Sequence, residues 1–227
     1  MKLLARMMAL LSFLVMFQYA NAASNSVYVD QIGDGSAINV TQTGNSNAVG
    51  NATNKATFNG QNNTVTVDQI GNNNVANLVV NGDGVTVNSL VTGDNNTVGI
   101  SCGAGGSCTG SSIVNTITGD NNTVTQNGEG LTLSTVTINS DNNTVNIQND
   151  SSAVAGAKST VLIDGGGGNE VAITQTGVAS TNGHDASVNI LGATNTVDIK
   201  QGGNVDSKVI TTITGSGNTL TVKSNHN

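Results

Sequence analysis

The sequence predicts an all-β protein, a β-solenoid of stacked two-stranded coils in which each coil is a strand, a tight turn and a strand. Three observations lead to this fold class. Apolar residues recur with a period of two, short turns of Gly, Asp, Asn and Ser separate them, and the segment TGDNNTV occurs at residues 92–98 and again at 118–124. A period of two is typical of β-strands. Because one such coil cannot bury its apolar row alone, we expect the coils to stack in an amyloid-like manner at about 4.8 Å.

Residues 1–22 are set apart from the repeats, because MKLLARMMALLSFLVMFQYANA has the form of a secretory signal peptide. Lys2 and Arg6 precede an apolar run from Met7 to Phe17, and small residues end the segment before Ala23. The run is shorter than the roughly 20 residues that a membrane-spanning helix needs. We therefore expect an exported chain, with the solenoid repeat domain over residues 23–227.

The composition of residues 23–227 is acidic and poor in large side chains. Two of the 7 Lys and Arg belong to the predicted signal peptide, so 5 remain against 14 Asp and Glu, a formal charge of −9. This balance argues against a nucleic-acid partner, which needs a basic surface. Only Tyr28 and Phe58 are aromatic, and Pro and Trp are absent. We expect a long, thin core of small β-branched residues, and the constant phase of the repeat argues against disorder.

Each repeat is organised around an asparagine that follows the turn residues, which we call the landmark asparagine. An apolar residue follows it two positions later in every unit, and an amide or apolar residue usually precedes it by five, with Asp164 as the exception. The landmark positions are Asn47, Asn63, Asn74, Asn96, Asn122, Asn143, Asn169, Asn195 and Asn218, with Ser36 in the first unit. An inward amide is costly without a partner. We therefore expect a self-assembly ladder of stacked amides, which also includes Gln31, Gln42, Gln69, Gln175 and Gln201.

The spacing of the landmarks changes along the chain. From Asn74 onward, successive landmarks are separated by the length of a two-stranded coil with its return loop, whereas Ser36 and Asn47 lie only about half as far apart. We interpret the shorter spacing as one strand directly following another. The interval from Asn47 to Asn63 fits neither spacing, so the register across this segment stays open.

The segment QIGDGSAINVTQTGNSNAV, residues 31–49, resembles the curlin repeats of the extracellular curli fibres of Gram-negative bacteria. The residues that match the curlin pattern are Gln31, Gly33, Ser36, Ile38 and Gln42 in one unit, and Gln69, Gly71, Asn74 and Ala76 in another. The match covers residues 27–80 and becomes degenerate further on, which leaves the role of major or nucleating subunit open.

The resemblance implies a subunit that passes through an outer-membrane secretion pore and polymerises on the cell surface. Its partners would be itself and other curli-type subunits, and the product would be an amyloid fibre of the biofilm matrix that serves adhesion and aggregation. The sequence also favours polymerisation on physical grounds. Terminal coils have unpaired strand edges, and a chain without Pro has few features that prevent such edges from pairing with another copy. We expect no enzyme activity, no cofactor and no small-molecule substrate.

Two cysteines, Cys102 and Cys108, enclose the glycine-rich segment GAGGS, with Cys102 in the place that Gln42 and Gln69 hold in their units. In an exported protein the pair predicts one local disulfide. A metal site would need further ligands, and His184 and His226 are distant in the sequence, in a loop and at the tail.

Three alternatives remain at this point. Gly165, Gly166, Gly168 and Glu170 faintly resemble a calcium-binding nonapeptide repeat. A monomeric adhesin stalk is a second alternative. The third is ice binding by an outward threonine column, although Thr is also simply a favoured exposed strand residue; the column would contain Thr64, Thr97, Thr123, Thr144, Thr196 and Thr219. Turn residues such as Asp94, Asp120 and Asp141 would also stack, and their place before a strand explains them structurally.

Overall fold

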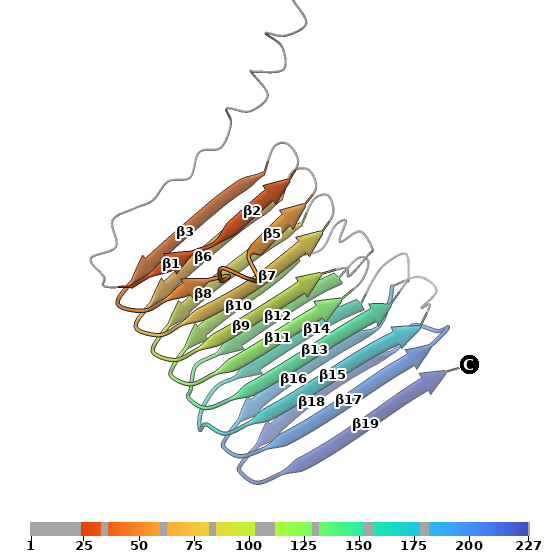
Figure 1. Ribbon diagram of the computed structural model, residues 1–227. Helices are drawn as coiled ribbons and strands as arrows, with labels where there is room; N and C mark the ends of the chain where they lie inside the picture. Colours follow the sequence, from red (N-terminus) through yellow and green to blue (C-terminus); the bar gives the residue numbers. More distant parts are fainter. Residues whose placement is uncertain are drawn as a thin grey trace, which may run out of the picture.

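The computed structural model describes residues 24–32, 36–59, 63–81, 85–102, 112–128, 132–151, 157–177 and 182–226. These residues form two parallel β-sheets that wind along one solenoid, and from β5 onward consecutive strands alternate between the sheets (Figure 1). The predicted fold class is confirmed. The predicted signal peptide lies outside the described residues. Within the described part of the chain there is no helix that is long and apolar enough to cross a membrane.

Over the described ranges, the first sheet has 11 strands and the second has 8. The first contains β1 (Ser26–Val27), β2 (Val29–Ile32), β4 (Ala48–Val49), β5 (Ala56–Asn59), β7 (Val75–Asn81), β9 (Thr97–Cys102), β11 (Thr123–Gly128), β13 (Thr144–Ser151), β15 (Glu170–Gly177), β17 (Thr196–Gly203) and β19 (Thr219–His226). The second contains β3 (Ala37–Thr43), β6 (Thr64–Ile70), β8 (Thr86–Thr92), β10 (Ser112–Thr118), β12 (Thr132–Ile138), β14 (Ala157–Ile163), β16 (Asp185–Leu191) and β18 (Lys208–Thr214).

The core is a narrow apolar layer between the two sheets, because every second side chain of each strand points inward. In β6, for example, Val65, Val67 and Gln69 are buried, and the residues between them are more exposed. In-register pairing stacks like on like, and one such column runs through Val98, Val124 and Val145. Each fully buried side chain of this kind stabilises the fold by about 1.5–3 kcal/mol.

The turns between the second and the first sheet have the backbone conformations that their composition predicts. In the turn before β9, Gly93 has a φ of 127° and Asn95 a φ of 60°, both in the left-handed half of the map. Gly adopts this region freely, and Asn tolerates it better than most residues. Gly93 is also needed for space, because a Cβ there would collide with the carbonyl oxygen of Gly119 in the next coil.

The open register between Asn47 and Asn63 is explained by an insertion. Val49 pairs with Ala76, and Thr57 pairs with Val79, so the segment from Asn51 to Lys55 leaves the ladder between β4 and β5. The side chain of Asn51 closes this loop by accepting hydrogen bonds from the backbone N–H groups of Thr53 and Asn54. Without the inserted segment, the interval between Asn47 and Asn63 would equal the short interval that precedes it in the chain.

The exception at Asp164 also has a structural cause. The inward position before the turn belongs to Ile163, which pairs with Ile138 and Ile190. The turn from Asp164 to Asn169 is one residue longer than the turn from Asn139 to Asn143, so Asp164 lies in the turn itself. Counting back five positions therefore reaches the wrong residue in this unit.

The landmark asparagines do not form one column, which corrects the predicted ladder. Asn47, Asn74 and the later landmarks precede strands of the first sheet, whereas Ser36 and Asn63 precede β3 and β6 of the second. Asn63 therefore lies at the opposite corner of the solenoid, in a column with Ser36 and Val85. The closely spaced units, such as those of Ser36 and Asn47, are the two halves of one coil and not successive coils.

Candidate functional site: the asparagine ladder and the open ends

One corner of the solenoid carries a continuous ladder of asparagines, which precede the strands of the first sheet. The backbone N–H of each one donates to the side-chain Oδ1 of the asparagine one coil earlier, at 2.9 to 3.0 Å. From Asn96 onward the Nδ2 group donates to the same Oδ1, at 3.0 to 3.1 Å. The asparagine ladder comprises Asn47, Asn74, Asn96, Asn122, Asn143, Asn169, Asn195 and Asn218.

The ladder also bonds in the opposite direction, toward the glycine of the following turn. Asn96 Nδ2 donates to the carbonyl oxygen of Gly119 at 2.8 Å, and Asn74 Nδ2 donates to that of Gly93 at 2.7 Å. Asn47, Asn169 and Asn195 make the same kind of bond, so each of these five asparagines bridges the coil before it and the coil after it. Because the ladder from Asn47 to Asn195 is buried, these bonds are protected from competing water.

Sequence reasoning missed the first member of the ladder. Asn25 accepts a hydrogen bond at its Oδ1 from the backbone N–H of Asn47, at 2.9 Å. It begins the segment Asn-Ser-Val, which has the same pattern as the Asn-Thr-Val segments of later coils. Asn25 also precedes Asn47 by the same interval that separates Asn74 from Asn96. The pattern and the interval together are the signal that would have identified it.

The predicted glutamines form two separate clusters. In the second sheet, Gln42 Nε2 donates to Gln69 Oε1 at 2.8 Å; in the first, Gln175 Nε2 donates to Gln201 Oε1 at 2.9 Å. Gln31 belongs to neither, because it pairs with Phe58 across β2 and β5. Asn63 has no hydrogen-bond partner at either side-chain atom. The amide network is therefore one long ladder with two short glutamine pairs, and Gln31 and Asn63 lie outside it.

A second, exposed ladder runs along the same turns. The backbone N–H groups of Asn72, Asp94 and Asp120 each donate to the carboxylate Oδ1 one coil later, at 2.6, 2.7 and 2.8 Å. The last acceptor is Asp141. These contacts support the structural interpretation of the turn aspartates, because each carboxylate satisfies a backbone donor of the preceding turn.

Of the two cysteines, Cys102 belongs to the residues that the structure describes. Cys102 ends β9 and pairs with Val80 and Gly128, so it lies in the first sheet, whereas Gln42 and Gln69, which hold the same place in their units, lie in the second. Cys108, and with it the predicted disulfide, lies outside the described residues.

His184 precedes β16 and is fully buried. Its Nδ1 lies 2.8 Å from Ser207 Oγ, and its Nε2 lies 3.0 Å from the carbonyl oxygen of Thr176. Both ring nitrogens thus have structural partners.

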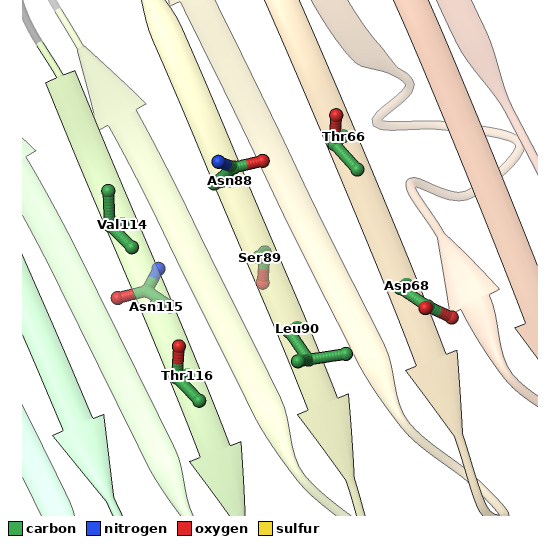
Figure 2. A pocket seen from close by; sticks show the side chains of 8 residues that line it. All are labelled: Thr66, Asp68, Asn88, Ser89, Leu90, Val114, Asn115 and Thr116. Carbon is green, nitrogen blue, oxygen red and sulfur yellow. The ribbon is translucent and has the colours of Figure 1, made fainter.

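The outer face of the second sheet contains a shallow hollow of about 320 Å³ over β6, β8 and β10. Figure 2 shows the side chains that surround it, with Asp68, Asn88 and Leu90 on the outer face. Ser89 and Asn115 lie beneath, with buried side chains that lack hydrogen-bond partners. Asp68 is the only titratable residue that lines the hollow, so the hollow does not bring an acid and a base together.

Both ends of the solenoid are open. Within the described part of the chain, no strand covers the outer edges of β1, β2 and β3 at one end or of β18 and β19 at the other (Figure 1). Apolar core residues that are only partly buried are confined to these terminal coils; they are Val27, Val29, Ile38, Val40, Val209, Leu220 and Val222. The asparagine ladder likewise ends in the exposed Asn218. Among the described residues, the terminal coils therefore lack the neighbour that covers every internal coil.

Comparison with protein-family models, with curated proteins and with solved structures gives no match for this chain. The buried Asn and Gln contacts agree with the curlin resemblance but are not specific to it. A function for this chain is therefore inferred from its fold and its open ends.

Proposed function

We propose that this chain is a secreted structural subunit that assembles end to end into curli-like extracellular amyloid fibres. The observation that carries the proposal is the pair of open ends, where partly buried core residues and unpaired strand edges occur together. Covering them with another copy of the same coil would extend both sheets and the apolar core. Parallel, in-register stacking of similar coils is the arrangement of cross-β fibres.

The sequence adds little that would oppose this growth. Edge strands of soluble proteins are usually protected by Pro, by inward charges, by bulges or by a covering element. This chain has no Pro, and the described residues of the terminal strands place their charges, such as Lys208 and Lys223, on the exposed side. The inward positions are apolar or neutral, so a second copy would meet no buried charge.

The wider role follows from the curlin resemblance and stays a prediction. It comprises export, passage through an outer-membrane pore, co-assembly with other curli-type subunits, and a place in biofilm matrix and adhesion. The absence of catalysis and of a cofactor, and the disulfide between Cys102 and Cys108, also stay predictions.

Seeded assembly tests the proposal directly. Residues 23–227 would be diluted from denaturant, and thioflavin fluorescence would be followed with and without preformed seeds, with electron microscopy of the product. We expect seeded growth of thin fibres. A persistently monomeric, β-rich solution would reject the proposal in favour of an adhesin stalk or an ice-binding protein.

A matched pair of variants separates end-to-end growth from other aggregation. Val222→Lys places a charge on the open core at β19, and Thr221→Lys places the same charge on the neighbouring outward position. Because a buried, unpaired charge is costly, we expect Val222→Lys to suppress seeded growth and Thr221→Lys to retain it.

Ice binding has less support from the geometry. Thr97, Thr123 and Thr144 do stack in register, but Glu170 occupies the next position of that column. Thr64 lies in the second sheet and outside the column. A test for shaping of ice crystals by the monomer would separate this alternative from fibre formation.

A further inference from the structure

The two sheets have different numbers of levels, where a level is one strand position along the solenoid. In the first sheet, β4 and β5 share a level because both pair with β7, and β1 and β2 share a level because they pair with β4 and β5. The 11 strands of the first sheet therefore occupy nine levels, whereas the 8 strands of the second occupy eight. The described winding begins and ends in the first sheet.

This difference matters for end-to-end assembly. If a second copy were added by translation alone, joining β19 to β1 and β2 of the next copy would leave one empty level between β18 and β3. Joining β18 to β3 would make the two first-sheet edges overlap. An empty level would leave a gap of about 4.8 Å in one sheet and expose the core beside it.

We propose that successive subunits are related by a half-turn about the fibre axis, an inference that rests on the proposed fibre-forming function. After β19, the next strand of the winding belongs on the second sheet, over β18. In the half-turn arrangement, β1 and β2 of the added copy take that place, and β3 then lies over β19. Both sheets continue without a gap, and the subunit repeat is 8.5 levels, about 41 Å at the usual strand spacing.

The side chains of the two ends fit this arrangement. Matching the residues that precede the strands, Asn25 with Ser207 and Ser36 with Asn218, fixes the register of β1 and β2 on β18 and of β3 on β19. Three of the six inward pairs are then apolar on apolar: Val27 with Val209, Ile38 with Leu220 and Val40 with Val222. The other three are Val29 with Thr211, Gln31 with Ile213 and Gln42 with Ser224, none of which contains a charge. Each partly buried core residue of one end thus meets an inward residue of the other.

The outward side chains distinguish the half-turn from simple translation. Tyr28 and Ile210 are exposed apolar residues at opposite ends, with 39% and 68% of their surface accessible. The half-turn places them side by side, so that each covers the other, whereas translation would place Tyr28 beside Thr221. Aromatic and β-branched residues are favourable partners on adjacent strands.

The ladder ends are also consistent with this contact. Ser36 Oγ is buried and has no hydrogen-bond partner among the residues that the structure describes. Among the described residues nothing donates to Asn218 Oδ1, which occupies the acceptor position that donors of the next coil use in every internal coil. The half-turn places Ser36 directly over Asn218, where its N–H and its hydroxyl can donate to that oxygen.

Pairwise cross-linking tests the contact. Single-cysteine variants in a Cys102→Ser, Cys108→Ser background would be mixed in pairs before assembly, and the fibres would be treated with a short bifunctional thiol reagent. The half-turn predicts a cross-linked dimer from Tyr28→Cys mixed with Ile210→Cys, and from Asn39→Cys mixed with Thr221→Cys. A dimer from Tyr28→Cys with Thr221→Cys would show translation and overturn the inference, as would fibres that yield neither of the first two dimers.

Electron cryo-microscopy of fibres of the unsubstituted chain gives a test without variants. We expect a subunit rise of about 41 Å and density for β1 and β2 against β18. A rise of about 43 Å, with β1 and β2 against β19, corresponds to translation by nine levels and would overturn the half-turn. If the unsubstituted chain forms no fibre, the proposed function itself fails, so the two failures are distinguishable.

Discussion

Replacing Asn122 with Ala removes the middle of the asparagine ladder. Asn122 Oδ1 accepts the backbone N–H and the Nδ2 group of Asn143, at 2.9 and 3.0 Å, and Asn122 Nδ2 donates to Asn96 Oδ1 at 3.1 Å. All three bonds are buried. In the variant, Asn96 Oδ1 still accepts a hydrogen bond from the backbone N–H of residue 122, and Asn143 Nδ2 still donates a hydrogen bond to Ser140 Oγ.

The largest single cost is the backbone N–H of Asn143, which loses its acceptor while it stays buried. An unsatisfied buried donor costs about 1–3 kcal/mol, and each lost amide bond costs about 0.5–1.5 kcal/mol. The expected loss in free energy of unfolding is therefore about 2–6 kcal/mol. In the turn itself the backbone is unchanged, because neither Asn122 nor Ala needs a positive φ at this position.

Urea unfolding of the freshly diluted monomer, followed by circular dichroism, measures this loss. Asn146→Ala is the matched control, since Asn146 is an exposed outward asparagine of β13 in the coil that follows. Hydrogen exchange at the Asn143 amide gives a local readout, and we expect its protection to fall in Asn122→Ala only. If the two variants unfold at the same urea concentration and the Asn143 amide stays protected, the ladder does not stabilise the fold as argued.

Three further outcomes are expected. Gly93→Ala should prevent native folding, as seen by loss of cooperative unfolding, because a Cβ would collide with the Gly119 carbonyl; Gly99→Ala, where the nearest atom is 3.8 Å away, should fold normally. Thr194→Asn should raise the free energy of unfolding by about 1 kcal/mol, because Thr194 has a φ of 55° that a β-branched residue adopts with strain; an unchanged urea midpoint would contradict this. Val145→Lys should abolish fibre assembly in the thioflavin assay, because Val145 is fully buried, whereas Asn146→Lys on the exposed side should assemble; fibres from the first variant would disprove the register.

Much of the fold is readable from local sequence. The period-two apolar pattern predicts the strands, and Gly followed by Asp or Asn predicts the turns, because both depend on the conformational preferences of a few adjacent residues. The positive φ values of Gly93 and Asn95 agree with this reasoning. The inward orientation of the landmark asparagines follows from the same alternation, and all of them except the terminal Asn218 are buried.

The pairing of strands from different coils determines which corner of the solenoid each asparagine occupies, which the local sequence pattern does not show. Asn47 and Asn63 have similar surroundings in the sequence, yet Asn47 belongs to the ladder and Asn63 lies at the opposite corner without a side-chain partner. A strand, a turn and an asparagine look alike at both corners of a coil, so only the pairing of strands from different coils separates them. The same pairing located the insertion from Asn51 to Lys55 and the unequal number of levels in the two sheets. Local preferences determine which residues form strands and turns, but the partner of each strand depends on contacts between residues far apart in the sequence, such as Asn122 and Asn143.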